Sequence, residues 1–135
     1  MLCVLRNVLY SCYDEDLEVW KEAIDLVTSI YKITDNYPNE EMYGIVNQIR
    51  KCAVSVPSNI SEGVVKHFDK ETLRFLDIAL GSLAELDTQM TISQNLAYMD
   101  SYDLLEVQIS KVNALLNGLI KYYNKQLKDN TALVP

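Results

Sequence analysis

Apolar side chains recur at intervals of three and four residues along most of the chain, which is the spacing of one face of an α-helix. Between residues 43 and 63 the apolar positions with this spacing are Ile45, Ile49, Cys52, Val56 and Ile60. Polar residues follow the same period beside them, at Gln48, Ser55, Asn59 and Glu62. The pattern therefore predicts an amphipathic helix with a buried face and a polar edge.

A proline lies inside this predicted helix. Pro57 has no N–H to donate, and its ring crowds the carbonyl of Ala53 one turn earlier. In an ordinary helix interior this costs about 3 kcal/mol. We therefore expect the helix to kink at Pro57, and we expect contacts elsewhere in the fold to offset the loss.

The same periodicity predicts four helices in all. They should span residues 16–35, 39–65, 69–97 and 101–125. The first has two adjacent apolar stripes, which together are wider than a contact between two helices requires. Gly81 lies inside the third helix, where glycine costs about 1 kcal/mol relative to alanine. A glycine in that position most often permits the close approach of another backbone.

The connections between these segments are short, and short connections make successive helices antiparallel. The sequence thus predicts an all-α fold, an up-down-up-down antiparallel four-helix bundle with its second helix kinked at Pro57. The bundle should occupy residues 14–128. An N-terminal extension at 1–13, disordered or an added strand, should precede it, and a frayed tail at 129–135 should follow it.

The turn between the second and third helices indicates which of their residues face each other. With its centre near residues 66 and 67, the facing pairs are Asn59 with Arg74, Cys52 with Gly81, and Gln48 with Glu85. We expect Arg74 to be held by Asn59 or Glu62, because an unpaired charge that turns inward is unfavourable. Gln48 should hold Glu85 for the same reason. Together these residues would form a structural polar layer.

Three stretches of the chain have the order and spacing of a known family. They are DLEVWKEA at 16–23, QIRKCAVSVPSNISEG at 48–63 and LRFLDIALGSLAELDTQ at 73–89. They resemble the bacterial four-helix bundles known as 23S rRNA-intervening-sequence proteins, over roughly residues 16–123. The resemblance implies a homopentameric ring of parallel bundles and no catalytic activity. Members are encoded in inserts of large-subunit rRNA genes or elsewhere, and relatives accompany the reverse transcriptases of diversity-generating retroelements.

Composition narrows the class of protein. A chain of 135 residues, 49% hydrophobic and 23% charged, is a single globular domain that can bury a core without disulfides or metal. Its three cysteines match no zinc or redox spacing, and Cys52 should be a buried small hydrophobe. The apolar start lacks the features of a signal peptide and is shorter than the ~20 residues of a membrane span. We expect a cytoplasmic protein without membrane contact.

The sequence offers no catalytic or metal-binding constellation. Glu62 and Glu85 would lie ~21 Å apart along the bundle axis, too far to act on one bond. His67 is the only histidine, whereas di-iron bundles need a Glu-x-x-His motif on each of two helices. Cys52 has no base nearby, and no phosphate-binding glycine motif occurs. We therefore expect no enzyme activity, no catalytic residue, no metal and no cofactor.

A net charge of −7 argues against a coat protein that neutralises many phosphates. From residue 47 to residue 75, however, five basic residues stand against three acidic ones. The candidates for nucleic-acid binding are Arg50, Lys51, Lys66, His67, Lys70 and Arg74. The last four, which we call the basic rim, lie near a helix N-terminus that favours phosphate, and Phe68 beside them can stack on a base. The alternative is a solvated turn with Arg74 in an ion pair.

These features predict a non-enzymatic homo-oligomeric accessory or scaffold protein, a pentamer by the resemblance, that associates with structured RNA or ribonucleoprotein through the basic rim. The wide apolar band of the first helix and the nine tyrosines favour an oligomer. Repetition of the basic rim around a ring would strengthen a weak attraction to phosphate. The alternative is a protein-binding scaffold that uses its acidic or apolar surface and has no contact with nucleic acid.

Overall fold

A computed structural model describes residues 14–66 and 70–132, and the side chains of 18–66 and 70–129. The predicted extension at 1–13, His67, Phe68 and the last three residues lie outside the described residues. The elements are the α-helices α2 (Asp14–Thr34), α3 (Ile45–Val64), α4 (Lys70–Asn95) and α5 (Asp103–Ala132), with the short 3-10 helix η1 (Asn39–Glu41). Within the described residues, the prediction of an all-α fold with four long helices is confirmed.

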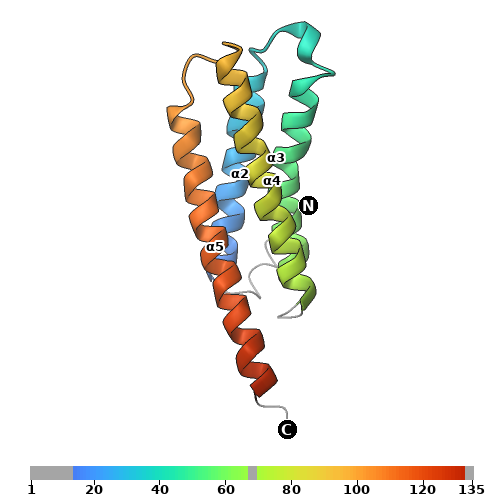
Figure 1. The fold of residues 1–135 in the computed structure, drawn as a ribbon, viewed down its shortest axis with the longest axis vertical. Helices are drawn as coiled ribbons and strands as arrows, with labels where there is room; N and C mark the ends of the chain where they lie inside the picture. The colour runs from blue at the N-terminus through green and yellow to red at the C-terminus, as the bar shows by residue number, and fades with distance from the viewer. Residues whose placement is uncertain (1–13, 67–69, 133–135) are drawn as a thin grey trace.

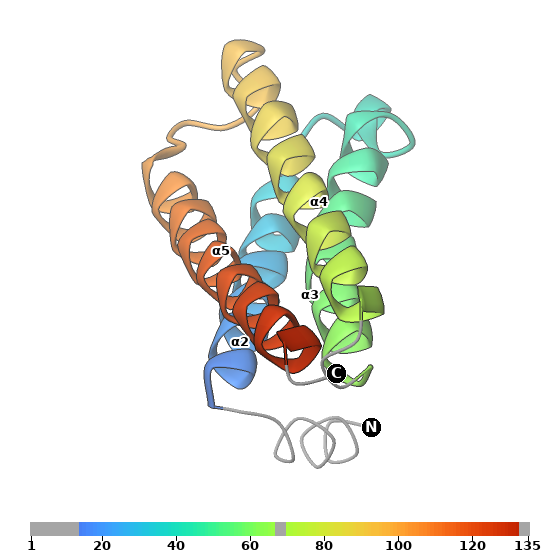
Figure 2. The ribbon, with the colours of Figure 1, turned by 60° about the horizontal axis from the view of Figure 1, so that its bottom comes forward.

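The four long helices pack side by side around one core (Figures 1 and 2). α3 contacts α2 and α4, and α5 contacts α4 and α2, so that each helix has two neighbours. In Figure 1 the loops that follow α2 and α4 lie at the upper end of the bundle, whereas α3 ends and α4 begins at the lower end. Lys66, Lys70 and Arg74 of the basic rim therefore lie at the end opposite these two loops.

Each helix contributes an apolar stripe to the core, as the periodicity predicted. The largest fully buried side chains include Leu26, Ile30, Ile49, Ile60, Leu76, Leu83, Leu86, Met90, Leu105 and Leu116. Each side chain of this kind stabilises the fold by about 1.5–3 kcal/mol relative to exposure in water. Pro57 is also buried, and α3 is helical from Ile45 to Val64 on both sides of it. The kink at Pro57 stays a prediction.

The second long helix begins later than the sequence pattern indicated. Residues 39–41 form η1 after Pro38, and α3 begins only at Ile45. The Glu41 carboxylate accepts a hydrogen bond of 3.4 Å from the backbone N–H of Ile45. It thereby satisfies one of the N–H groups that the start of a helix leaves unpaired.

The ends of α4 and α5 also differ from the expected boundaries. α4 ends at Asn95, and Ala97 has the left-handed φ of 58° while the Tyr98 N–H donates to the Ser93 carbonyl over 3.0 Å. This is the hydrogen bond of a Schellman helix end. α5 continues to Ala132, past the predicted end near residue 125, and its last turns project beyond the other helices (Figure 1).

The contact between α3 and α4 has nearly the predicted register. The Cys52 Sγ donates to the carbonyl of Ser82 over 2.9 Å, one position from the expected Gly81. Gly81 itself is exposed, and a Cβ built on it would meet nothing within 4 Å. Within the chain the close approach therefore does not occur at Gly81. It occurs at Gly63, near the end of α3.

Candidate nucleic-acid interface

Gly63 allows the first turns of α4 to approach the last turn of α3. A Cβ on Gly63 would lie 3.1 Å from the Cβ of Phe75 and 3.1 Å from the backbone oxygen of Thr72. Only a residue without a side chain fits this contact without moving α4. The contact fixes the Cα–Cβ end of Phe75 against α3, while the side chain as a whole remains half-buried.

The ring of Phe75 lies beneath two cations from different elements. The Arg74 guanidinium carbon is 4.7 Å from the ring centroid, and the Lys66 Nζ is 6.0 Å from it. Lys66 follows the end of α3, whereas Arg74 lies in the second turn of α4. The aromatic ring therefore brings together two of the predicted rim residues. Both distances are within the range of a cation–π interaction.

Glu71 neutralises part of this positive charge. The Arg74 Nη2 donates to Glu71 Oε2 over 2.9 Å, and the Arg74 Nε donates to both carboxylate oxygens over 3.2 and 3.3 Å. Both side chains are about half exposed, at 58% and 48%. The hydrogen bonds from Arg74 lower the pKa of Glu71, and the same contact raises the pKa of Arg74. We call Lys66, Glu71, Arg74 and Phe75 the Phe75 cluster.

The partners of Arg74 and Asn59 differ from those that the register predicted. Arg74 hydrogen-bonds Glu71, three residues earlier in its own helix, and Glu62 adds a smaller electrostatic contribution to its raised pKa. The Asn59 amide donates to the carbonyl and the hydroxyl of Ser55 over 2.8 and 2.9 Å. Residues three or four apart on one helix can pair without any tertiary contact, so these pairs form in preference to the predicted pairs between α3 and α4.

The remaining members of the predicted polar layer are also placed differently. Gln48 and Glu85 are exposed rather than turned inward. The polar contact between α3 and α4 is made instead by Ser55 and Ser82, whose hydroxyl oxygens lie 2.8 Å apart.

Arg50 and Lys51 lie away from the basic rim. α3 rises about 21 Å between Arg50 and its end at Val64. The Arg50 guanidinium donates to Thr34 Oγ1 and Asp35 Oδ1, each over 2.9 Å, and stacks over the ring of Tyr31 at 4.6 Å. Its side chain is only 19% exposed. Arg50 therefore joins α3 to the end of α2.

Lys70 begins α4 four residues before Arg74, so the two residues share one face of that helix, as predicted. Lys66 lies outside α4, and its Nζ comes into the same region by lying over the Phe75 ring. His67 falls outside the described residues. The structure thus assembles Lys66 and Arg74 around the ring of Phe75.

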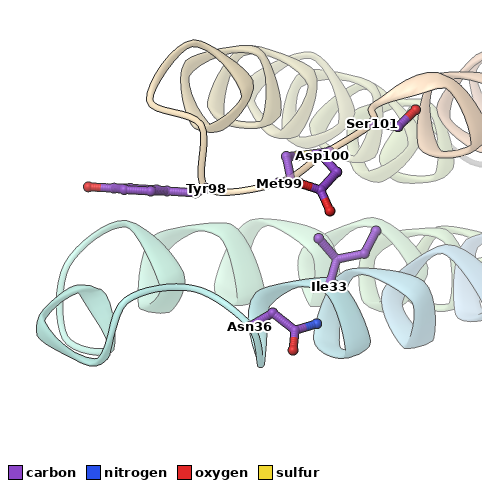
Figure 3. Close-up of a pocket in the computed structure, with 6 residues that line it drawn as sticks. All are labelled: Ile33, Asn36, Tyr98, Met99, Asp100 and Ser101. Atoms are coloured by element: carbon purple, nitrogen blue, oxygen red, sulfur yellow. The ribbon is translucent and has the colours of Figure 1, made fainter.

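A pocket of about 400 Å³ lies at the opposite end of the bundle. Figure 3 shows Met99 and Asp100 of the loop after α4 across from Ile33 and Asn36. Tyr98, which also lines it, donates a hydrogen bond of 3.1 Å to Glu41 and packs 5.5 Å from the ring of Tyr37. The lining includes a carboxylate and an amide but no cation, so this pocket is unsuited to phosphate.

Two further properties of the described residues bear on function. No group of three or more histidine, cysteine, aspartate or glutamate residues among them could hold a metal ion. Within residues 14–66 and 70–132, no helix is both long and apolar enough to cross a membrane.

Sequence reasoning missed Phe75, Glu71 and Gly63 as parts of the interface. The spacing of Glu71 and Arg74 was a readable signal, because oppositely charged residues three apart on a helix interact. The placement of Phe75 was not readable, since it depends on how closely α4 approaches Gly63.

Comparison with known proteins supports the resemblance seen in the sequence. No curated protein sequence matches this chain. The sequence model of the 23S rRNA-intervening sequence protein family matches residues 15–118, which include α3, α4 and the Phe75 cluster. The match covers well over half of the 135 residues. The chain belongs to the family of 23S rRNA-intervening sequence proteins.

Proposed function

We propose that this protein is a non-enzymatic, homo-oligomeric accessory or scaffold protein of the bacterial cytoplasm that associates with structured RNA or ribonucleoprotein through the basic rim. The observation that carries the proposal is the Phe75 cluster, in which Lys66 and Arg74 lie over one aromatic ring. Cations beside an aromatic ring are typical of surfaces that hold nucleic acid without base-specific contacts. The family name, which refers to 23S rRNA, agrees with this role.

The proposal includes a pentamer with the bundles parallel to each other. A groove of about 300 Å³ between α2 and α3 supports it, with Trp20, Val27 and Pro57 in its lining. Ile24 and Val54 beside them are 37% and 40% exposed, so the described residues cover the wide apolar band of α2 only in part. A second copy would cover it, and the open surface at Gly81 would admit another backbone.

The proposed bundle is up-down-up-down and antiparallel, with α3 kinked at Pro57. The position of the loops after α2 and α4 at one end in Figure 1 supports this path. This path puts the basic rim at one end of each subunit. In a ring of parallel subunits, all of the rims would therefore lie on the same face. Several weak sites on one face bind a long RNA more tightly than one site does.

The test is the mass and absorbance of the full-length protein across a size-exclusion peak, at low and high salt. We expect a mass near five chains and co-eluting nucleic acid that high salt removes, because contacts with phosphate release counterions. Lys66→Glu and Lys70→Glu should reduce the bound nucleic acid. Lys51→Glu is the matched control, since it makes the same charge change about 20 Å from the end of α3.

A monomer would contradict the assembly, and an oligomer that binds no RNA at low salt would contradict the RNA-associated role. The second outcome would favour a protein-binding scaffold. That alternative rests on α5, where Leu104 and Val107 are 85% and 67% exposed beside acidic Asp103 and Glu106. A protein interface of this apolar kind should respond little to salt.

A further inference from the structure

We infer that Phe75 stacks on an unpaired base of single-stranded RNA, and that Glu71 competes with the RNA phosphates for Arg74. This inference rests on the proposed function and specifies what the basic rim recognises. It concerns unpaired nucleotides, such as those in the loops of a structured RNA.

The placement of Phe75 carries the first half of the inference. Its Cβ lies close to Gly63, so the backbone that carries the ring is packed against α3 before any ligand arrives. Lys66 and Arg74 reach the ring from two different elements. A base that stacks on the ring would have its flanking phosphates beside these cations, which can move from the ring to the phosphate oxygens. Bases inside a duplex are already stacked on each other and cannot reach the ring.

The hydrogen bonds of Arg74 carry the second half. Its Nε and Nη2 both donate to Glu71, and this edge of the guanidinium is one that can hold a phosphate through two hydrogen bonds. A phosphate that takes these donors displaces Glu71 from Arg74, at least in part. Because both side chains are about half exposed, the exchange requires no opening of the core. Glu71 lowers the affinity of the basic rim for RNA.

The experiment measures binding of the full-length protein to a labelled RNA single strand of about 12 nucleotides and to the duplex of the same sequence, by fluorescence anisotropy. Phe75→Leu should weaken binding of the single strand by roughly five- to a hundredfold, the range of one lost base–aromatic contact. Binding of the duplex should change by less than about twofold, since it uses only the charges. Phe75→Tyr should retain binding of the single strand.

Glu71→Gln tests the competition. It should tighten binding of the single strand by roughly two- to fivefold, the range expected when an exposed ion pair no longer holds Arg74. Glu40→Gln is the matched control, because it removes one exposed carboxylate from η1 at the opposite end of the bundle. It should leave the affinity nearly unchanged.

The outcomes separate this inference from the proposed function. If the protein binds RNA but Phe75→Leu weakens single strand and duplex equally or not at all, the stacking is wrong while the RNA association stands. If Glu71→Gln has the same effect as Glu40→Gln, the competition is wrong. If the unaltered protein binds neither RNA at low salt, the proposed function fails and this inference fails with it.

Discussion

For Cys52, the sequence predicted the burial and, to within one position, the facing residue on α4, but not the hydrogen bond that the thiol makes. Its place on the apolar stripe of α3 indicated an interior position, and the side chain is 7% exposed. Its hydrogen bond to the Ser82 carbonyl could not be foreseen from the pattern. Burial, and secondarily the nearby Glu85 carboxylate, raises the pKa of the Cys52 thiol from 9.0 to about 12.

The first prediction follows from this raised pKa. Cys52 should resist alkylation by iodoacetamide at pH 8 in the folded protein and react once the chain is unfolded, because the thiolate is the reactive form. Mass spectrometry of the peptide that contains Cys52 measures this. Rapid labelling of the folded protein at Cys52 would contradict it.

The same thiol should make stability depend on alkaline pH. Below pH 9.0 it is protonated in both states, and between pH 9.0 and about 12 the unfolded chain loses the proton first. Stability should therefore fall as the pH rises through this interval. Cys52→Ala should lose less stability between pH 9 and pH 11 than the unaltered protein, as measured by urea unfolding at each pH. Equal losses would contradict the assignment.

At the scale of the element, Gly63 and Gly118 lie in opposite packing environments within their helices. A methyl group on Gly63 would lie 3.1 Å from two atoms of α4, closer than an ordinary van der Waals contact, whereas Gly118 lies on the exposed side of α5 with nothing within 4 Å of a built Cβ. Both residues stand inside helices, where alanine is intrinsically better by about 1 kcal/mol. Only packing distinguishes them.

Gly63→Ala should therefore destabilise the protein by about 1–2 kcal/mol, because the strain of an added methyl exceeds the gain in helix propensity. Gly118→Ala is the matched control and should stabilise it by about 0.5–1 kcal/mol. Urea unfolding followed by circular dichroism measures both changes. The same sign for both substitutions would mean that α4 can shift away from Gly63.

The end of α4 supports a further prediction. Ala97 occupies the left-handed position of a Schellman end at φ 58°, a position that glycine normally fills. A side chain there costs about 1–2 kcal/mol, so Ala97→Gly should raise the free energy of unfolding by roughly 1 kcal/mol. Ala84→Gly, on an exposed helical position of α4, should instead lower it. A loss of stability in Ala97→Gly would contradict the assigned conformation.

At the scale of the whole molecule, one core is shared by all four helices. Leu86 is fully buried in it, and Trp20, the only tryptophan, lies 7% exposed on α2 at the edge of the same cluster. Unfolding followed by tryptophan fluorescence should therefore coincide with unfolding followed by circular dichroism. Leu86→Ala should lower both midpoints together, with a loss of about 2–5 kcal/mol at fixed protein concentration. Separate transitions would show that α2 unfolds independently.

The charge distribution also belongs to this scale. The chain carries a net charge of −7, yet Lys66, Lys70 and Arg74 collect at one end of the bundle and Arg50 is used between α2 and α3. The hairpin of α3 and α4 brings Lys66 close to Arg74. Arg50 belongs to the same basic stretch of the sequence, but it lies well before the end of α3 and therefore far from Lys66.

The sequence by itself determined the helices and the faces that they bury, because periodic apolar positions leave a helix no other way to cover them. It also determined the family, since residues 15–118 carry the family pattern. The tertiary structure alone decided the hydrogen-bond partner of Cys52, the later start of α3 and the position of Phe75. Side-chain partners depend on distances of a few ångströms between helices, and those distances are set by how closely the backbones pack at residues such as Gly63.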